Sequence, residues 1–393
     1  MKRSKLSLAM ALLVASLSLT SCIKEEPKNK ECDILNAWVQ GDELASCFTD
    51  KAEMRKSDIS STDKEITFKV RSVMSLPKQL PVYFDVTPGA TVEPASGSMQ
   101  DFTAGPVTYT VTSEDGAWKR QYKVAFVEPV LPSFKFSFEN VEVSEKTATG
   151  CYYHKFYDID TQTRQTYYYW DSGNSGAAMT MSGGQPADFP TSSVDNGYQG
   201  KGVCLKTVST GALGEWMKKP IAAGNLFVGK FLVENVLIDP LKCTQFGIPV
   251  SVIPIKVTGY YKYLPGDKFT DLNMKEVPGR KDEASIYAVF YRNKDVAGDK
   301  VFLYGDDVKD LDHLVENNPN VMKVAQVKQV QSTDQWTRFE MFFEGKDVDR
   351  EVAAKEGYNL ALVFSSSKGG ADFEGAIGSR LYIDEVELSF EEK

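Results

Sequence analysis

Short segments in which apolar and polar residues alternate dominate the chain between about residues 60 and 128. A period of two places the apolar side chains on one face of a strand and the polar side chains on the other. We therefore expect strands that are each buried on one side. An Asp115-Gly116 pair between the last two segments predicts a hairpin. The segments with this alternation are 66–70, 82–86, 107–111 and 122–126.

The same pattern, interrupted by turns and one proline-rich segment, predicts two β domains. Short strands at this spacing over residues 32–128 are typical of an immunoglobulin-like β-sandwich. Glu128-Pro129-Val130-Leu131-Pro132 predicts a short, stiff linker. In 133–393, strand-like segments separated by long polar loops favour a jelly-roll β-sandwich over an up-and-down barrel. The predicted fold class is all-β, with an N-terminal immunoglobulin-like sandwich followed by a C-terminal jelly roll.

Strands in the C-terminal domain are expected wherever β-branched and aromatic residues are concentrated. Short helices are expected at 310–316 and 347–355. The expected strands are 134–138, 203–207, 257–263, 285–291, 337–343, 360–364 and 381–390.

The first residues have the organisation of a secretory signal peptide. Basic residues precede an apolar run from Leu6 to Leu19, which is shorter than the ~20 residues that a membrane-spanning helix needs. Leu19-Thr20-Ser21-Cys22 resembles the bacterial lipobox. That resemblance implies removal of residues 1–21 and lipid attachment at Cys22. An ordinary signal peptide with a chance cysteine is the alternative.

Residues 22–31 are expected to form a charged, flexible stalk after the lipidated cysteine. Ile23-Lys24-Glu25-Glu26 resembles the export tag of Bacteroidetes lipoproteins that are moved to the cell surface. The resemblance implies an outer-membrane protein that is lipid-anchored and faces the cell exterior. A solvated charge cluster on a tether is the alternative.

Composition narrows the classes of partner. The chain has 393 residues and a net charge of −9, which argues against nucleic-acid binding because phosphate recognition needs a basic surface. After the signal segment no apolar run approaches membrane length, so lipid on Cys22 is the only membrane attachment expected.

Cys32 and Cys47 are near enough to close a small disulfide loop, but the sequence leaves their pairing open. Cys204 lies in a strand-like segment and is interpreted as a buried small hydrophobe, and no cysteine spacing is typical of a zinc site.

An ordered series of motifs in the C-terminal region resembles the "putative carbohydrate metabolism domain" of Bacteroidetes lipoproteins. The resemblance covers nearly all of 133–393 and rests on the order and spacing of the motifs. It implies a galactose-binding-like jelly roll and association with glycans, without a defined activity. Residues 84–124 likewise resemble the immunoglobulin-like spacer modules of such lipoproteins. The motifs are Trp170-Asp171-Ser172-Gly173-Asn174, Phe189-Pro190-Thr191, Gly197-Tyr198-Gln199-Gly200-Lys201, Ala223-Gly224-Asn225-Leu226-Phe227, Tyr260-Tyr261-Lys262-Tyr263, Gly375-Ala376-Ile377-Gly378-Ser379 and Leu381-Tyr382-Ile383-Asp384-Glu385-Val386.

Aromatic residues beside polar loops are candidates for binding sugars, whose C–H faces pack on aromatic rings while polar neighbours bind the hydroxyls. Alternation places Tyr261 and Tyr263 on one face of a strand and Tyr260 on the other, so one of these faces should be core. For each aromatic candidate, packing in a large core is the alternative; Trp216 and Trp336 are interpreted as packing residues, with Trp216 the more open case. The candidate glycan-binding residues are Trp170, Asp171, Asn174, Tyr198, Asn225, Tyr260 and Tyr261.

A structural calcium ion is a second hypothesis. Asp384 falls on an otherwise apolar face of the last strand, where an unpaired carboxylate would be very unfavourable. A shift of the apolar phase after Phe138 indicates a bulge at Glu139-Asn140. In jelly-roll binding modules the terminal strands often meet around calcium, so Glu139 and Asp384 could contribute to such a site. Bonding of Asp384 to backbone amides or to a lysine is the equally weighted alternative.

Catalytic and nucleotide-binding motifs have less support. Gly224–Lys230 nearly matches a phosphate-binding loop, but Phe231 stands where a hydroxyl should bind magnesium, so nucleotide binding is not expected. A Gly-x-Ser-x-Gly elbow is missing from the sequence. A glycosidase needs only two carboxylates about 5–10 Å apart, and Asp171 is the best single suspect.

The sequence therefore predicts a non-catalytic surface lipoprotein that binds glycan through its C-terminal domain and requires no cofactor. A glycoside-active enzyme that uses paired carboxylates is the main alternative. An adhesin or structural subunit with a protein partner is the third.

Overall fold

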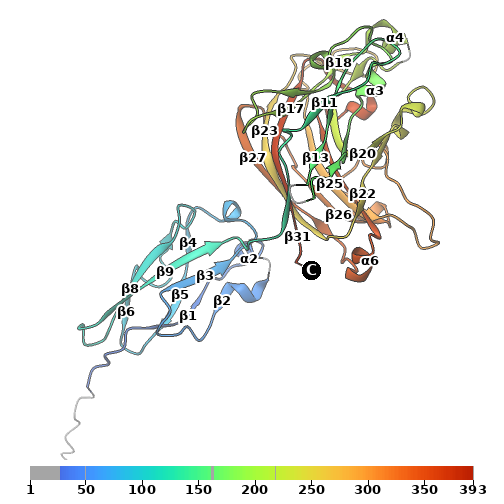
Figure 1. Cartoon of the computed structure of the whole chain (residues 1–393). Coiled ribbons are helices and arrows are strands. Elements are labelled where there is room, and N and C mark those ends of the chain that lie inside the picture. Colours follow the sequence, from blue (N-terminus) through green and yellow to red (C-terminus); the bar gives the residue numbers. More distant parts are fainter. Residues whose placement is uncertain (1–26, 49, 161–162, 217, 393) are drawn as a thin grey trace, which may run out of the picture. The chain divides into compact units, whose positions relative to one another are not determined.

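The computed structural model describes residues 27–48, 50–160, 163–216 and 218–392. The predicted signal peptide, Cys22 and the start of the stalk lie outside these residues. The chain divides into two compact units between Val130 and Leu131, within the predicted linker (Figure 1). In the described part of the chain, no helix is long and apolar enough to cross a membrane.

The N-terminal unit contains two main sheets. Strand β3 runs parallel to β9, and the other paired strands are antiparallel. Helical segments are α2 (Asp42–Ala45), η1 (Lys51–Met54) and η2 (Val73–Ser75). In spatial order, the first sheet contains β2 (Arg55–Lys56), β1 (Ile34–Trp38) and β5 (Tyr83–Val86), the second contains β3 (Glu65–Lys69), β9 (Lys119–Val127), β8 (Val107–Thr112) and β6 (Thr91–Glu93), and β4 (Leu80–Pro81) pairs with β7 (Met99–Gln100).

Both sheets of this unit contribute to one core. Phe68, Tyr109 and Tyr122 are fully buried there, which confirms the predicted inward faces of their strands. Strands β8 and β9 form the predicted hairpin. A sandwich of two sheets is thus present, and its immunoglobulin-like type stays a prediction. Cys32 and Cys47 are buried free thiols, and the Cys47 thiol donates to the Ser75 carbonyl at 3.4 Å instead of pairing.

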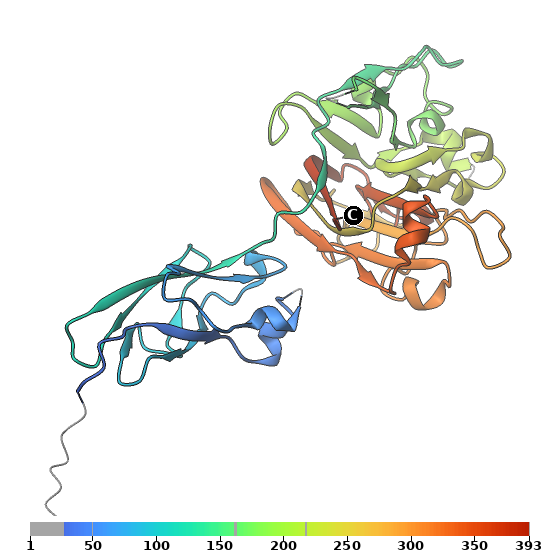
Figure 2. The same cartoon turned by 60° about the horizontal axis from the view of Figure 1, so that its bottom comes forward.

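The C-terminal unit is built from two larger antiparallel sheets (Figures 1 and 2). The first is six-stranded and contains β16 (Thr191–Val194), β17 (Gly202–Lys206), β31 (Arg380–Phe390), β23 (Pro254–Leu264) and β27 (Thr333–Phe342), with β10 (Ser133–Phe136) paired to β31. The second is eight-stranded and contains β15 (Trp170–Asp171), β20 (Asn225–Phe231), β29 (Tyr358–Ser365), β25 (Ser285–Arg292), β26 (Val321–Gln326) and β28 (Glu344–Gly345), with β21 (Thr244–Phe246) paired to β20 and β22 (Ile248–Val250) paired to β29.

Smaller elements surround these sheets. The predicted strands each overlap an observed strand, and the predicted helices at 310–316 and 347–355 overlap the helices Leu314–Asn317 and Arg350–Ala354. The two-stranded pairs are β11 (Val141–Val143) with β12 (His154–Phe156), β13 (Asp158–Ile159) with β14 (Thr166–Tyr167), β18 (Val208–Ser209) with β19 (Ile221–Ala222), and β24 (Phe269–Thr270) with β30 (Gly375–Ala376). The helical segments are α3 (Asn174–Ala177), α4 (Gly211–Trp216), α5 (Leu314–Asn317), α6 (Arg350–Ala354), η3 (Pro186–Asp188), η4 (Val233–Asn235), η5 (Pro240–Lys242) and η6 (Gly370–Asp372).

The main core lies between the two sheets of the C-terminal unit. Alternate residues of each strand point into it, including Leu226 of β20 and Leu362 of β29. Their neighbours Phe227 and Val363 belong to a second apolar cluster, on the opposite face of the eight-stranded sheet. Because the two sheets share one core, their outer faces lie on opposite sides of the sandwich. The all-β prediction is confirmed at this level, while the jelly-roll assignment stays a prediction.

Candidate functional site

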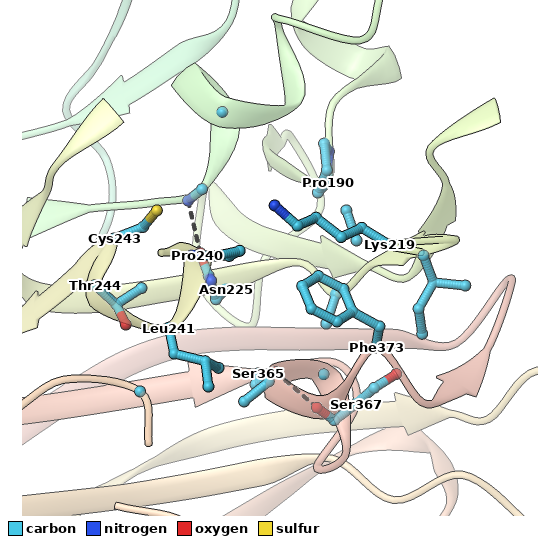
Figure 3. A pocket seen from close by; sticks show the side chains of 18 of the residues that line it. Pro190, Lys219, Asn225, Pro240, Leu241, Cys243, Thr244, Ser365, Ser367 and Phe373 are labelled. Carbon is cyan, nitrogen blue, oxygen red and sulfur yellow. Dashed lines mark hydrogen bonds between the residues drawn. The ribbon is translucent and has the colours of Figure 1, made fainter. Parts of the chain in front are cut away.

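A cavity of about 640 Å³ lies on the outer face of the eight-stranded sheet (Figure 3). Its floor comes from neighbouring strands: Asn225 of β20, Ser285 and Tyr287 of β25, and Val363 and Ser365 of β29. These residues alternate with core residues along their strands, so the sheet itself directs them outward. The volume is within the range of about 300–1,000 Å³ that small-molecule sites occupy.

Loops form the mouth of the cavity. Lys219 follows α4, and its Nζ atom donates to the Val236 carbonyl at 2.8 Å, which joins the loops around α4 and η4. Trp216 and Leu237 line the same mouth and expose 82% and 62% of their surface. Such exposure leaves an indole face available for a ligand.

Phe373 lines the cavity from the segment after η6. Its backbone has φ of 57°, in the left-handed region that is uncommon for residues with a side chain. The conformation is held by the Phe373 N–H, which donates to the Gly370 carbonyl at 3.1 Å. Strained backbone of this kind persists where the surroundings fix it, and it is frequent at functional sites.

Asn225 is held in place at the floor by neighbouring segments. The Gly173 N–H donates to Asn225 Oδ1 at 2.7 Å, and the Thr191 hydroxyl donates to the Asn225 carbonyl at 2.6 Å. A Cβ atom on Gly224 would lie 2.4 Å from both the Lys206 nitrogen and a neighbouring carbonyl oxygen, so only glycine fits before Asn225. The Asn225 Nδ2 group donates no hydrogen bond within the described residues, so it is available to a ligand.

A buried carboxylate stabilises one wall of the cavity. Asp282 Oδ2 accepts hydrogen bonds from the Ser367 hydroxyl at 2.6 Å, the Ser379 hydroxyl at 2.7 Å and the Ala376 N–H at 2.8 Å. Burial raises the pKa of Asp282, and these hydrogen bonds oppose the rise. Ser367 lines the cavity, and its hydroxyl also lies 2.5 Å from the Thr207 hydroxyl. The network therefore fixes the segment that carries Ser367.

The charged groups around the cavity are mostly cationic. Lys219, Lys309 and Lys368 line it, and Asp372 pairs with Lys309 at 2.7 Å. A lining that combines apolar side chains with an exposed indole and a few fixed polar groups is suited to a sugar ring and its hydroxyls.

The segment that carries Trp170, Asp171 and Asn174 borders this cavity, but these side chains have structural roles. Trp170 exposes 6% of its surface and packs in the core between the sheets, so its ring offers no face to a sugar. Asp171 Oδ2 accepts the Phe231 N–H at 2.7 Å. Asn174 is fully buried, and its amide exchanges two hydrogen bonds with the backbone of Thr191. Trp170 therefore packs in the core, as the alternative for the aromatic candidates states. The Asp171 carboxylate is hydrogen-bonded to a backbone amide.

Two of the predicted tyrosines lie on β23 of the other sheet, and Tyr198 lies in the loop between its strands β16 and β17. Tyr261 exposes 4% of its surface in the core, whereas Tyr260 points outward from β23. Tyr198 stacks on Tyr260 with ring centroids 3.6 Å apart and planes at 7°. The structure therefore separates the predicted residues: Asn225 faces the cavity, and Tyr198 and Tyr260 share the opposite side of the sandwich.

The residues of the calcium hypothesis anchor a loop. Asp384 is fully buried, and its oxygens accept the N–H groups of Gln199 at 2.9 Å and Glu385 at 2.8 Å. Glu139 Oε1 accepts the Lys201 N–H at 2.9 Å. Across the described chain, no group of three or more acidic, histidine or cysteine side chains could hold a metal ion. Both carboxylates thus bond backbone amides, as the alternative describes, and a calcium ion completed by loop carbonyls stays a prediction.

The near-match to a phosphate loop is also explained by the fold. Gly224 leads directly into strand β20, which runs through Asn225–Phe231, instead of into a helix whose N-terminus could hold phosphate. Cys204 is buried in β17, as predicted.

Sequence reasoning missed Trp216, Lys219 and Phe373 as residues of the cavity. The sequence favours packing for Trp216 but leaves it the more open case, because it lies in a loop-like segment. In such a segment no alternation of apolar residues indicates a buried face for the aromatic ring. The lack of this pattern could have marked Trp216 as exposed. Phe373 and Lys219 gave no local signal, because only the folded loops bring them to the same cavity.

Comparisons with known proteins find similarity over both units of the chain. Residues 137–389 match the family model described as "Putative carbohydrate metabolism domain", and residues 47–125 match the N-terminal domain of SGBP, the surface glycan-binding proteins. A crystal structure from Bacteroides thetaiotaomicron VPI-5482, described as a putative glycoside hydrolase, is 36% identical, with 94% of this chain and 100% of that chain covered and a TM-score of 0.58. Another so described, from Bacteroides vulgatus ATCC 8482, is 39% identical, with 65% of this chain and 98% of that chain covered and a TM-score of 0.58. No curated protein matches the chain.

The family match spans most of the chain, and the similarity to the B. thetaiotaomicron protein extends over both units. The chain thus belongs to the family of the putative carbohydrate metabolism domain and carries an SGBP-type domain before it.

Proposed function

We propose that this protein binds a glycan, without cleaving it, in the cavity on the outer face of the eight-stranded sheet. The observation that carries the proposal is the combination of an exposed indole, Trp216, with fixed polar groups inside an otherwise apolar cavity. Asn225 Nδ2 and Lys219 offer donors to sugar hydroxyls, while Trp216 offers a stacking face. The family and SGBP-domain matches support a carbohydrate ligand.

The charges of the cavity favour binding over hydrolysis. Hydrolysis of a glycosidic bond uses two carboxylates about 5–10 Å apart. Among the described lining residues Asp372 is the one carboxylate, and it is paired with Lys309. The carboxylate of Asp171, the catalytic candidate of the sequence, accepts a hydrogen bond from the Phe231 N–H.

Isothermal titration calorimetry of the full chain against a panel of neutral host and dietary oligosaccharides tests the proposal. We expect saturable binding of at least one oligosaccharide and weaker binding by Trp216→Ala. Folded wild-type protein that binds no member of a broad panel would contradict it. Equal affinity of wild type and Trp216→Ala would remove the cavity as the site.

The cellular location is proposed on the sequence features outside the described residues. The lipobox at Cys22 and the following charged segment support a lipid anchor on the outer membrane that faces the cell exterior, and the SGBP-domain match supports a surface location. Metabolic labelling with a fatty-acid analogue should label wild type but not Cys22→Ala. Equal labelling of both proteins would exclude this anchor.

A second candidate function, glycoside hydrolysis, is favoured by a different cavity of about 310 Å³. Asp158 and Glu356 line it, as do Tyr167 and Tyr169, whose rings stack at 5.2 Å. Burial raises the pKa of Asp158 to about 6, with the Trp170 indole opposing the rise. A carboxylic acid with a raised pKa can act as a general acid near neutral pH.

Both similar crystal structures are described as putative glycoside hydrolases, which supports this second function. Oligosaccharide turnover that disappears in Asp158→Asn but persists in Trp216→Ala would establish it. The absence of turnover in wild type, with binding retained, would leave the non-catalytic function.

A further inference from the structure

The outer face of the six-stranded sheet carries aromatic and basic side chains together. On β23, Tyr260 and Lys262 point outward and alternate with the core residues Tyr261 and Tyr263. Outward faces of antiparallel sheets are normally polar, so aromatic rings concentrated there are unusual. The aromatic–basic patch consists of Tyr198, Tyr260, Lys262, Trp336, Arg380 and Tyr382.

Direct contacts join the members of the patch. Tyr198 stacks on Tyr260 at 3.6 Å and meets the Trp336 ring at 6.3 Å and 80°. The Lys262 ammonium lies 4.6 Å from the Trp336 ring centroid and 5.0 Å from that of Tyr382. These rings and the ammonium group therefore form one continuous surface. Tyr198 exposes 47% of its own surface to solvent.

The loop that carries Tyr198 is fixed from below. Asp384 accepts the Gln199 N–H and Glu139 accepts the Lys201 N–H, so a buried or bonded carboxylate holds the backbone on each side of the turn. A Cβ atom on Gly197 would lie 2.4 Å from the Lys201 carbonyl oxygen, so the turn closes only with glycine. A preorganised ring loses little conformational entropy on binding. The buried Asp384 and the exposed Glu139, the two residues of the calcium hypothesis, therefore both bond the backbone of this turn.

The patch is locally cationic in a protein whose net charge is −9. Lys206 of β17 lies opposite Arg380 of β31, and Lys262 lies opposite Tyr382. Burial raises the pKa of the Cys204 thiol, and the charges of Lys206, Arg380 and Lys262 all oppose that rise, which places the three cations around one point. The adjacent Glu385 carboxylate is paired with Lys135 instead.

We propose that the aromatic–basic patch is a second glycan-binding surface, selective for polysaccharides that carry anionic groups. Stacking of sugar rings on Tyr198 and its aromatic neighbours would supply contact area. Lys262 and Arg380 would bind carboxylate or sulfate groups along the chain, since Arg matches planar oxyanions and Lys acts as a point charge. The surface lies on the opposite side of the sandwich from the cavity, so one domain can hold two glycan chains.

Affinity electrophoresis and calorimetry with the full chain test this surface on polygalacturonate, which carries carboxylates, dextran sulfate, which carries sulfates, and neutral dextran. We expect binding to at least one anionic polymer and none to dextran. Lys262→Ala and Arg380→Ala should each weaken it about fivefold, as for loss of one charge contact near a protein surface. Tyr198→Ala should also weaken binding.

Two matched variants serve as controls. Lys355→Ala removes an exposed lysine after α6 and should bind the anionic polymer as wild type does. Trp216→Ala should lose the cavity ligand but keep the anionic polymer, which separates failure of this surface from failure of the cavity. Affinity should fall as salt is raised, because the Debye length shortens to about 8 Å at physiological ionic strength.

The polymer that binds identifies the anionic group, and binding to either supports the proposal. Folded wild type that binds neither anionic polymer would overturn it. Unchanged binding in Lys262→Ala and Arg380→Ala, or equal weakening by Lys355→Ala, would also overturn it, as would binding to vesicles of anionic phospholipid in place of the polysaccharides.

Discussion

Replacement of Trp216 by alanine tests the cavity most directly. The side chain exposes 82% of its surface, so it contributes little to packing in the folded protein. We expect the free energy of unfolding to change by less than about 0.5 kcal/mol, as for other exposed positions. Any effect on glycan binding would then reflect the lost contact with the ligand.

The size of the effect follows from the area that a sugar would cover. A fully buried aromatic side chain removes about 150–250 Å² from water, and a sugar stacked on one face would cover roughly half of that. At about 25 cal/mol per Å² this corresponds to about 2–3 kcal/mol. Affinity should therefore fall at least about thirtyfold.

Calorimetry of the wild type and Trp216→Ala with the same oligosaccharide gives the affinity ratio, and urea unfolding gives the stability difference. Trp118→Ala is the matched control, because Trp118 is also exposed, at 60%, but belongs to the N-terminal unit. An unchanged affinity in Trp216→Ala would refute the assignment of the indole as a stacking face. Equal losses in both variants would refute the cavity as the origin of the effect.

Further predictions concern the structure around the two surfaces. Gly224→Ala should lower the free energy of unfolding by about 1–3 kcal/mol in urea, because the new Cβ meets backbone atoms at 2.4 Å. Asp171→Ala should cost a similar amount, about 1–3 kcal/mol, since it leaves the Phe231 N–H without its acceptor; a cost near zero would show that water replaces the carboxylate. Burial raises the pKa of Asp384 to about 6 from an ordinary value near 3.8, so the folded state binds this proton more tightly than the unfolded chain does. The stability that the protonated Asp384 contributes should be complete below about pH 4 and lost as pH rises towards 6. The free energy of unfolding of Asp384→Asn, relative to that of the wild type, should therefore rise as pH is increased from 4 to 7. Parallel pH profiles of the two proteins would contradict this.

The sequence predicted the fold better than the site, for a physical reason. Alternation along a long strand determines which residues point inward, and it separated Tyr260 from Tyr261 correctly. Trp170 lies in a strand of only two residues, where alternation gives no direction. Asn225 was named as a polar loop residue within a motif of the family resemblance, whereas in the structure it begins β20 and its partners come from segments that are distant in sequence.

The carboxylate hypothesis shows a related limit. The sequence indicated that a buried Asp384 must have a partner, and the structure supplies backbone amides. Whether a metal ion or an N–H group satisfies a carboxylate depends on how a loop folds over it. That fold is specified by Gly197 and its neighbours, whose requirement becomes visible only when the atoms that a Cβ would meet are known.

The cavity combines a floor of sheet residues with a mouth of exposed loop residues, and this division affects how such a protein can diversify. Substitutions on the floor disturb strands that also form the main core, so most would be removed by selection for stability. Substitutions at exposed positions such as Trp216 and Leu237 cost little folding energy. Relatives that keep this framework can therefore acquire different ligands by changing the mouth alone, and ligand preference should diverge faster than the fold.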